Sequence, residues 1–265
     1  MNSVLMAVVS VSAIGLICAV VLVIASKFMA VKVDERFPKV RGELPGANCG
    51  ACGFAGCDAY AQALLDNPDL KCNLCVPGGA GVAKNLSEAL GKDFEAVEEK
   101  IAVVRCSGTD DKTGDKVEYQ GYETCKAAKL FYGGKGLCSY GCVGFGDCVA
   151  ACKYDAMHII DGKATVDPSM CVGCAACAKA CPSHLIEIVP KKAKVYVGCS
   201  SCDKGMNVRK ACSAGCIGCH KCEKECPVGA ITVTNNLASI DYSKCISCGK
   251  CADVCIAKCI HKIYS

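Results

Sequence analysis

The first 26 residues carry no charged side chain, and segment 4–25 is apolar almost throughout. An apolar helix of about 20 residues crosses the roughly 30 Å hydrocarbon core of a bilayer. Basic residues follow at Lys27, Lys32 and Arg36, which by the positive-inside rule places the rest of the chain in the cytoplasm. A cleaved signal peptide would need a basic start and a shorter apolar core. We therefore predict a single-pass transmembrane anchor over residues 1–27.

Beyond the anchor, the apolar runs are short. Segment 28–46 contains charges and two prolines and is predicted to be a linker. Helical patterns cover Asp58–Leu65 and Ser87–Lys100, with Ser87 as the expected N-cap of the second. Alternation around two-residue turns predicts β-hairpins at 157–166 and 231–240. Short helices are expected near Cys148–Cys152 and Cys177–Cys181.

Two cysteine runs stand out near the C-terminus. Each has the spacing C-x2-C-x2-C-x3-C, and the first is followed by Pro227. This is the ligand pattern of a two-cluster bacterial ferredoxin, in which three thiolates hold one 4Fe-4S cluster and the fourth holds the other. Zinc is the alternative, but zinc sites use two separated pairs rather than matched runs of four. The pattern predicts site 4 (Cys216, Cys219, Cys222, Cys255) and site 5 (Cys226, Cys245, Cys248, Cys251).

Much of this pattern occurs twice, with an offset of 74 residues. Seven of the eight ligands have counterparts in the first copy, which indicates a tandem duplication. The exception is Phe145, which stands where the second copy has Cys219, and Lys153 replaces the proline. Cys138 is expected to supply the missing ligand from upstream. The first copy is then predicted to form site 2 (Cys138, Cys142, Cys148, Cys181) and site 3 (Cys152, Cys171, Cys174, Cys177).

A further cysteine group precedes the repeats, as Cys49-x2-Cys52-x4-Cys57. Its glycines allow the backbone to approach a cluster closely. The fourth ligand is Cys72 or Cys75, and we prefer Cys75 because the turn Pro77-Gly78-Gly79 can present its thiolate. These residues predict a small all-α module with site 1 (Cys49, Cys52, Cys57, Cys75).

Composition supports a metal-built protein. The chain has 28 cysteines in 265 residues, no tryptophan and only 6% aromatic residues, so bound clusters are expected to hold the small domains together. The net charge of +4 is too small to indicate nucleic-acid binding. Five sites use 20 cysteines. Four of the remaining cysteines form a second group, which is either a sixth cluster or a set of free buried thiols (Cys106, Cys125, Cys199, Cys212).

The predicted fold class is α+β, with two tandem two-cluster ferredoxin-like domains after the anchor and the module. The boundaries are 1–27 (anchor), 28–46 (linker), 47–100 (module), 101–189 (first ferredoxin-like domain, with an N-terminal extension) and 190–265 (second ferredoxin-like domain).

The order of these modules resembles that in the B subunits of the Rnf complexes, the membrane-bound ion-translocating ferredoxin:NAD oxidoreductases, over essentially the whole chain. The resemblance implies that reduced ferredoxin donates electrons to five or six 4Fe-4S clusters, which pass them to membrane-spanning and flavin- or NAD-binding subunits. No catalytic residue, flavin motif or G-x-G-x-x-G dinucleotide motif is found on this chain. The alternative is a polyferredoxin that connects soluble redox enzymes without ion movement.

Overall fold

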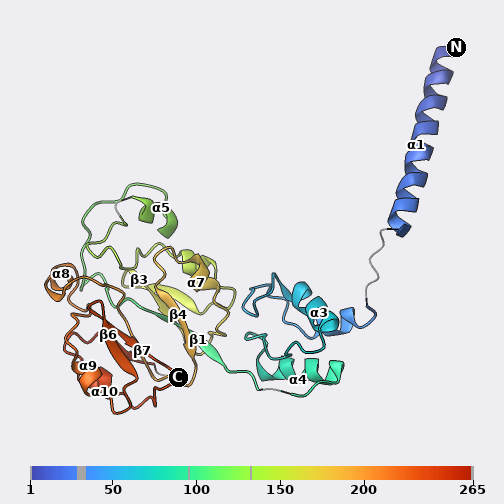
Figure 1. The fold of residues 1–265 in the computed structure, drawn as a ribbon. Coiled ribbons are helices and arrows are strands. Elements are labelled where there is room, and N and C mark those ends of the chain that lie inside the picture. The colour runs from blue at the N-terminus through green and yellow to red at the C-terminus, as the bar shows by residue number, and fades with distance from the viewer. Residues whose placement is uncertain (1, 29–33, 95, 132, 264–265) are drawn as a thin grey trace. The chain divides into compact units, whose positions relative to one another are not determined.

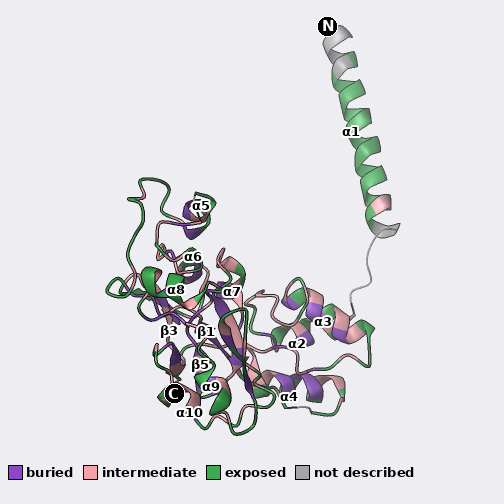
Figure 2. Ribbon diagram, turned by 60° about the vertical axis from the view of Figure 1, so that its left-hand side comes forward, coloured by how far each residue is buried: buried purple, intermediate pink, exposed green. Residues whose placement is uncertain are grey.

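The computed structural model describes residues 2–28, 34–94, 96–131 and 133–263. The chain divides into two compact units, Met1–Pro38 and Lys39–Ser265. The first unit contains α1 (Asn2–Phe28), in which Val8–Ser26 has a mean hydropathy of 2.9. Its described side chains are almost all exposed (Figure 2). This helix is long and apolar enough to cross a membrane, as predicted.

Helix α2 (Phe37–Gly42) spans the boundary between the two units, and the second unit continues with the helices α3 (Cys57–Asp66) and α4 (Gly79–Leu90) (Figure 1). Helix α3 agrees with the sequence prediction and ends just before Pro68, which cannot extend it. Helix α2 was not expected, because it lies inside the predicted linker.

The prediction of a helix over 87–100 is wrong. Ser87 lies in the last turn of α4, where its hydroxyl donates to the Ala83 carbonyl at 2.9 Å instead of capping a new helix. Helix α4 ends at Gly91, which has a φ of 64° and forms a left-handed C-cap. The sequence favoured a later start because Ser87 is a good N-cap residue in isolation.

Residues 100–190 and 195–262, here called the first and second repeat, share one order of elements. Each opens with a strand that pairs antiparallel with the strand closing the same repeat, and each encloses a β-hairpin. In the first repeat the strands are β1 (Lys100–Val104), β2 (Met157–Ile160), β3 (Lys163–Val166) and β4 (Ile186–Pro190). In the second they are β5 (Val195–Val197), β6 (Ile231–Thr234), β7 (Leu237–Ile240) and β8 (Ile260–Lys262).

Short helices lie between these strands. They are α5 (Cys125–Leu130), α6 (Asp147–Ala150), α7 (Ala176–Ala180), α8 (Gly205–Ala211), α9 (Lys221–Lys224) and α10 (Lys250–Asp253). Both predicted hairpins are confirmed, and their turns have the positive φ angles that a tight hairpin requires, 50° at Asp161 and 63° at Asn236. The helices expected after the cysteine runs are also confirmed by α6 and α7.

Cysteine forms much of the core of both repeats. In the first, buried Cys148 and Cys177 pack with Met157 and Ile186, and further cysteines contact this cluster from partly buried positions. The second repeat has the same organisation around Val195 and Ile231. The buried positions lie inside both repeats (Figure 2). Candidate ligands are therefore part of the hydrophobic core of each repeat.

Candidate iron–sulfur sites

The four cysteines predicted for site 3 lie together as expected. Cys152, Cys171, Cys174 and Cys177 line one cavity of about 310 Å³. Backbone N–H groups point at two of the sulfurs, from Ala102 to Cys171 at 3.3 Å and from Ala156 to Cys152 at 3.4 Å. Hydrogen bonds of this kind stabilise negative charge on cluster sulfur.

Site 2 differs from the sequence-based grouping in one ligand. A cavity of about 380 Å³ is lined by Cys142, Cys148 and Cys181 as predicted, but its fourth cysteine is Cys125 rather than Cys138. Among the described residues, Ser183 has the only buried side-chain oxygen or nitrogen without a hydrogen-bond partner, and Ser183 lines this cavity. A hydroxyl donor of that kind fits a cavity that holds an electron-rich group.

The local sequence explains why Cys125 takes this place. The carboxylate of Asp147, next to the ligand Cys148, accepts the N–H groups of Cys125 and Lys126 at 2.9 and 3.0 Å. The ring of Phe145 lies 5.5 Å from that of Tyr119, and both pack against the cluster that contains Cys125. Phe145, which stands where the second repeat has Cys219, therefore helps to hold the segment that carries Cys125.

In the module, Cys75 faces the other three predicted ligands of site 1. Its sulfur interacts electrostatically with those of Cys49, Cys52 and Cys57, and burial raises the pKa of its thiol. Cys57 begins α3, and its N–H donates to the Asn48 side chain at 2.8 Å, which ties the cysteine loop to the helix. Cys72 is also buried, and its sulfur and that of Cys75 both interact electrostatically with Tyr60. The choice of Cys75 over Cys72 therefore stays a prediction.

The second repeat assembles its cysteines in the predicted way. The sulfur of Cys222 interacts electrostatically with the sulfurs of the other site 4 residues, Cys216, Cys219 and Cys255. For site 5, the sulfur of Cys251 interacts with those of Cys245 and Cys248. Cys226 packs against the same core cluster and accepts the N–H of Ala230 at 3.2 Å, which matches the bond from Ala156 to Cys152 in the first repeat.

Several thiols of these sites are poor acids without a cation nearby. Burial raises the pKa of Cys148 and of Cys222 to about 12, and that of Cys177 to about 11. They would be neutral at pH 7 unless a positively charged group bound the sulfur. Within the described residues, no group of three or more His, Cys, Asp or Glu residues is arranged to hold a single metal ion. The sulfurs of sites 2 and 3 instead surround a space, as a multi-iron cluster requires.

One cysteine outside the predicted ligand sets touches site 4. Cys259 is 2% exposed, and its sulfur lies 3.6 Å from that of Cys255. Hydrogen bonding with the Cys259 thiol lowers the pKa of Cys255 and that of Cys216. The matching residue of the first repeat, 74 positions before Cys259, is Leu185, which is buried but has no hydrogen-bond donor in its side chain. Site 4 therefore has a hydrogen bond that site 2 lacks.

We predict that Cys259→Leu lowers the reduction potential of one cluster without loss of iron. A hydrogen bond to ligand sulfur stabilises the more negative, reduced cluster. Its contribution of about 1 kcal/mol corresponds to roughly 40 mV for a one-electron couple. Redox titration followed by electron paramagnetic resonance measures the shift, and Leu185→Ile, at the matched position, is the control. An unchanged set of potentials would contradict this role for Cys259.

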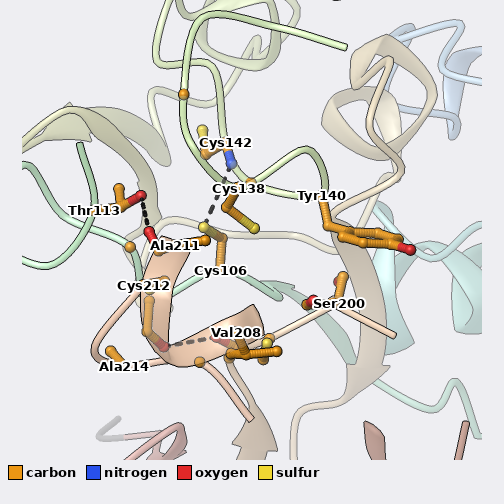
Figure 3. A pocket seen from close by; sticks show the side chains of 18 of the residues that line it. Cys106, Thr113, Cys138, Tyr140, Cys142, Ser200, Val208, Ala211, Cys212 and Ala214 are labelled. Atoms are coloured by element: carbon orange, nitrogen blue, oxygen red, sulfur yellow. Dashed lines mark hydrogen bonds between the residues drawn. The ribbon is translucent and has the colours of Figure 1, made fainter. Parts of the chain in front are cut away.

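The second group of cysteines, Cys106, Cys125, Cys199 and Cys212, is not brought together. Cys106, Cys199 and Cys212 line another cavity between the repeats, which Cys138 and Cys142 line as well and Cys125 does not (Figure 3). The sequence-based grouping differs because it had placed Cys138 in site 2, which left Cys125 for this group. In the fold, Cys199 follows β5 just as Cys106 follows β1. The matching segments Val104–Cys106 and Val197–Cys199 were the signal for this correspondence.

Neighbouring sites within the second unit are close. The amines of Lys153 and Lys179 donate to the carbonyls of Ala47 and Cys49 at 2.9 and 3.2 Å, which joins the module to the first repeat. The sulfur of Cys174 in site 3 interacts electrostatically with that of Cys49 in site 1. Within the first repeat, the sulfur of Cys148 interacts with that of Cys177, so sites 2 and 3 are neighbours.

Comparison with known families agrees with this geometry. Residues 44–77 match a family model for an Fe-S cluster module, residues 164–187 a 4Fe-4S binding domain, and residues 215–259 a 4Fe-4S dicluster domain. These matches confirm an iron–sulfur module followed by ferredoxin-type 4Fe-4S domains.

Three curated relatives each align with 98% of the chain. The protein from Clostridium ljungdahlii, named as the B subunit of a proton-translocating ferredoxin:NAD(+) oxidoreductase complex, is 46% identical over 91% of its own length. The Acetobacterium woodii protein, named as the B subunit of a Na(+)-translocating complex of the same kind, is 41% identical over 78% of its length. The Methanosarcina acetivorans protein, named as the B subunit of an ion-translocating oxidoreductase complex, is 42% identical over 99% of its length. The chain belongs to this family, the B subunits of the Rnf-type ion-translocating ferredoxin:NAD oxidoreductase complexes.

Proposed function

We propose that this chain is the electron-transfer subunit of an ion-translocating ferredoxin:NAD oxidoreductase complex, and that it receives electrons from reduced ferredoxin. It belongs to a family of such subunits, and its domains are of the 4Fe-4S type. The observation that carries the proposal is the arrangement of cysteine sites as neighbours from the module into the repeats. NAD reduction and ion movement are assigned to partner subunits, because a single apolar helix cannot enclose an ion path.

We assign five four-cysteine sites as 4Fe-4S ligand sets, with Cys125 in site 2. The sets are Cys49, Cys52, Cys57, Cys75; Cys125, Cys142, Cys148, Cys181; Cys152, Cys171, Cys174, Cys177; Cys216, Cys219, Cys222, Cys255; and Cys226, Cys245, Cys248, Cys251. A bound cluster supplies one-electron redox chemistry in the range of about −700 to +450 mV.

The residues of the chain tune and protect these sites. Backbone N–H groups such as those of Ala102, Ala156 and Ala230 donate to ligand sulfurs, which stabilises the reduced state. Buried apolar side chains such as Met157 and Ile231 exclude water from the sulfurs. Tyr154 lies between two sites, since its phenol interacts electrostatically with Cys174 of site 3 and Cys49 of site 1.

We further propose that α1 anchors the chain in the cell membrane and that residues 34–263 lie on the cytoplasmic side. The apolar stretch Val8–Ser26 has the length of a membrane span. Several lysines and arginines lie on its C-terminal side, which favours this orientation. Soluble ferredoxin then has direct access to the cysteine-rich unit.

The test uses the complex purified anaerobically from membranes. We expect Cys174→Ala, which removes a ligand of site 3, to lower ferredoxin-driven NAD reduction to the level of membranes without this subunit. NADH oxidation by an artificial acceptor at the partner subunits should be unchanged. Cys202→Ala is the matched control, because Cys202 is exposed and lies outside the five proposed sets.

Two results would count against the proposal. Full NAD reduction by the Cys174→Ala complex would show that electrons do not need site 3. Purification of the intact chain from membranes without multi-span or flavin-bearing partners would favour the polyferredoxin alternative.

A further inference from the structure

We infer that Cys106, Cys138, Cys199 and Cys212 form a sixth 4Fe-4S site, built at the junction of the two repeats from two cysteines of each. The inference rests on the proposed function, since it extends the same series of clusters. It replaces the grouping that the sequence suggested, in which Cys125 took the place of Cys138.

The four cysteines line one cavity, which Cys142 of site 2 lines as well (Figure 3). The sulfurs of Cys212 and Cys106 lie 3.6 and 3.7 Å from the point that a Cβ on Gly108 would occupy, so both face one small region. The sulfur of Cys138 interacts electrostatically with those of Cys106 and Cys212, and the sulfur of Cys212 with that of Cys199. Each of the four sulfurs therefore interacts with at least one other member of the group.

The site follows the internal symmetry of the fold. Cys106 and Cys199 both follow the first strand of a repeat, β1 and β5. Cys138 and Cys212 are related by the 74-residue offset that relates the ligands of sites 2 and 4. Each repeat therefore contributes the same two positions. Random burial of unused thiols would not produce this pairing.

The backbone around these sulfurs resembles that of the other proposed ligands. The N–H groups of Tyr140, Ser201 and Ala214 lie near the sulfurs of Cys138, Cys199 and Cys212, in each case from the residue two positions ahead. The same turn occurs at proposed ligands of sites 2, 3 and 4 (Cys142, Cys174, Cys216). Such turns direct N–H groups at a sulfur that carries negative charge.

The space in front of the sulfurs is kept open by glycine. A Cβ on Gly108 would lie 3.2 Å from the Thr113 methyl group and point at two sulfurs, and a Cβ on Gly141 would lie 3.7 Å from the Cys138 sulfur. A cubane takes four thiolate ligands, and four cysteines outside the other five proposed sets line this cavity.

Hydrogen bonds between the repeats hold the site in place. Ser107 donates to the Gly198 carbonyl at 2.7 Å, and Ser200 donates to the Arg105 carbonyl at 3.1 Å, so the ends of β1 and β5 are joined on both sides of Cys106 and Cys199. Thr113 donates to the carbonyl of Ala211, next to Cys212, at 2.8 Å (Figure 3). A site that needs ligands from both repeats is therefore pre-organised.

The position of the site suggests its role. The N–H of Cys142, a proposed site 2 ligand, donates to the Cys106 sulfur at 3.4 Å. The sulfur of Cys199 interacts electrostatically with that of Cys216, a proposed site 4 ligand. The proposed site therefore has a neighbour in each repeat, site 2 in the first and site 4 in the second.

Two double variants of the full chain, produced without oxygen, distinguish this grouping from the sequence-based one. In the sequence-based grouping, Cys138 belongs to site 2 and Cys125 to the sixth site. We expect about 24 iron atoms per wild-type chain from six clusters. Cys106→Ala with Cys138→Ala removes ligands of one site and should leave about 20 iron atoms. Cys106→Ala with Cys125→Ala removes ligands of two sites and should leave about 16 iron atoms. Cys202→Ala should keep the wild-type count.

The grouping would be overturned if the variant with Cys106→Ala and Cys138→Ala kept less iron than the variant with Cys106→Ala and Cys125→Ala. A wild-type content of about 20 iron atoms would overturn the sixth cluster, even if a double variant failed to fold. Single Cys199→Ala gives a second readout, because loss of one ligand from this site is expected to remove iron without changing the resonance signals of the other five clusters. An unchanged iron count in Cys199→Ala would also contradict the inference. Failure of the proposed function would be seen separately: the Cys174→Ala complex would then reduce NAD at the wild-type rate, whatever the iron content of the chain.

Discussion

Removal of iron from the purified chain is expected to abolish the cooperative unfolding transition of residues 100–262. Proposed ligands pack into the cores of both repeats, so a bound cluster would join core side chains that are far apart in the sequence. Structural zinc sites contribute about 10–16 kcal/mol to the folding of zinc-finger peptides, whereas a whole domain is stable by only about 5–15 kcal/mol. Loss of even one comparable site would therefore exceed the stability of a repeat.

Burial adds to this effect. Without iron, thiols such as Cys148 and Cys177 stay protonated at neutral pH, because burial raises their pKa to about 12 and 11. A protonated thiol leaves its N–H donors with a weak acceptor in the protein interior. The iron-free repeats thus lose the bonds to metal and also most of the strength of the hydrogen bonds that surround them.

Circular dichroism during anaerobic heating measures this outcome, before and after iron is removed with a chelator. The ellipticity from α1 should persist in detergent, because that helix contains no proposed ligand, and it serves as the internal control. A sharp transition at an unchanged temperature in the iron-free chain would contradict the view that clusters hold the repeats together. Restoration of the transition by iron and sulfide would exclude irreversible damage.

The second large effect is expected from Cys125→Ala, which should remove the iron of site 2, about four atoms per chain. The double variant Cys125→Ala with Phe145→Cys is expected to regain it. Phe145 occupies the position of Cys219 in the second repeat, so a cysteine there would complete a C-x2-C-x2-C run in the first. The added ligand would make the loop resemble site 4 and remove the need for Cys125.

Iron and sulfide analysis of both variants measures this rescue. Phe145→Leu in the Cys125→Ala background is the matched control, since it changes the packing against Tyr119 without adding a ligand. Full iron content in Cys125→Ala alone would show that Cys125 is not a ligand. Rescue by Phe145→Leu as well would show that packing, and not ligation, limits the site.

The sequence by itself determined the cysteine pattern, the duplication, the apolar anchor and both hairpins. These features depend on neighbours in the chain: C-x2-C loops, turns such as Asp161-Gly162, and an uninterrupted apolar run. The helix predicted from Ser87 failed because the last turn of α4 uses its hydroxyl, and Gly91 ends that helix.

Only the tertiary structure decided where Cys125 and Cys138 lie. The sequence predicted Cys138 as the upstream substitute for the missing ligand at position 145, and it left Cys125 for another group. The choice depends on contacts across the fold: Asp147 binds the N–H of Cys125 beside site 2, and bonds between the repeats place Cys138 in one cavity with Cys199 and Cys212. The fixed offset was a misleading guide there, since a segment of different length separates the first strand from the first ligand in the two repeats.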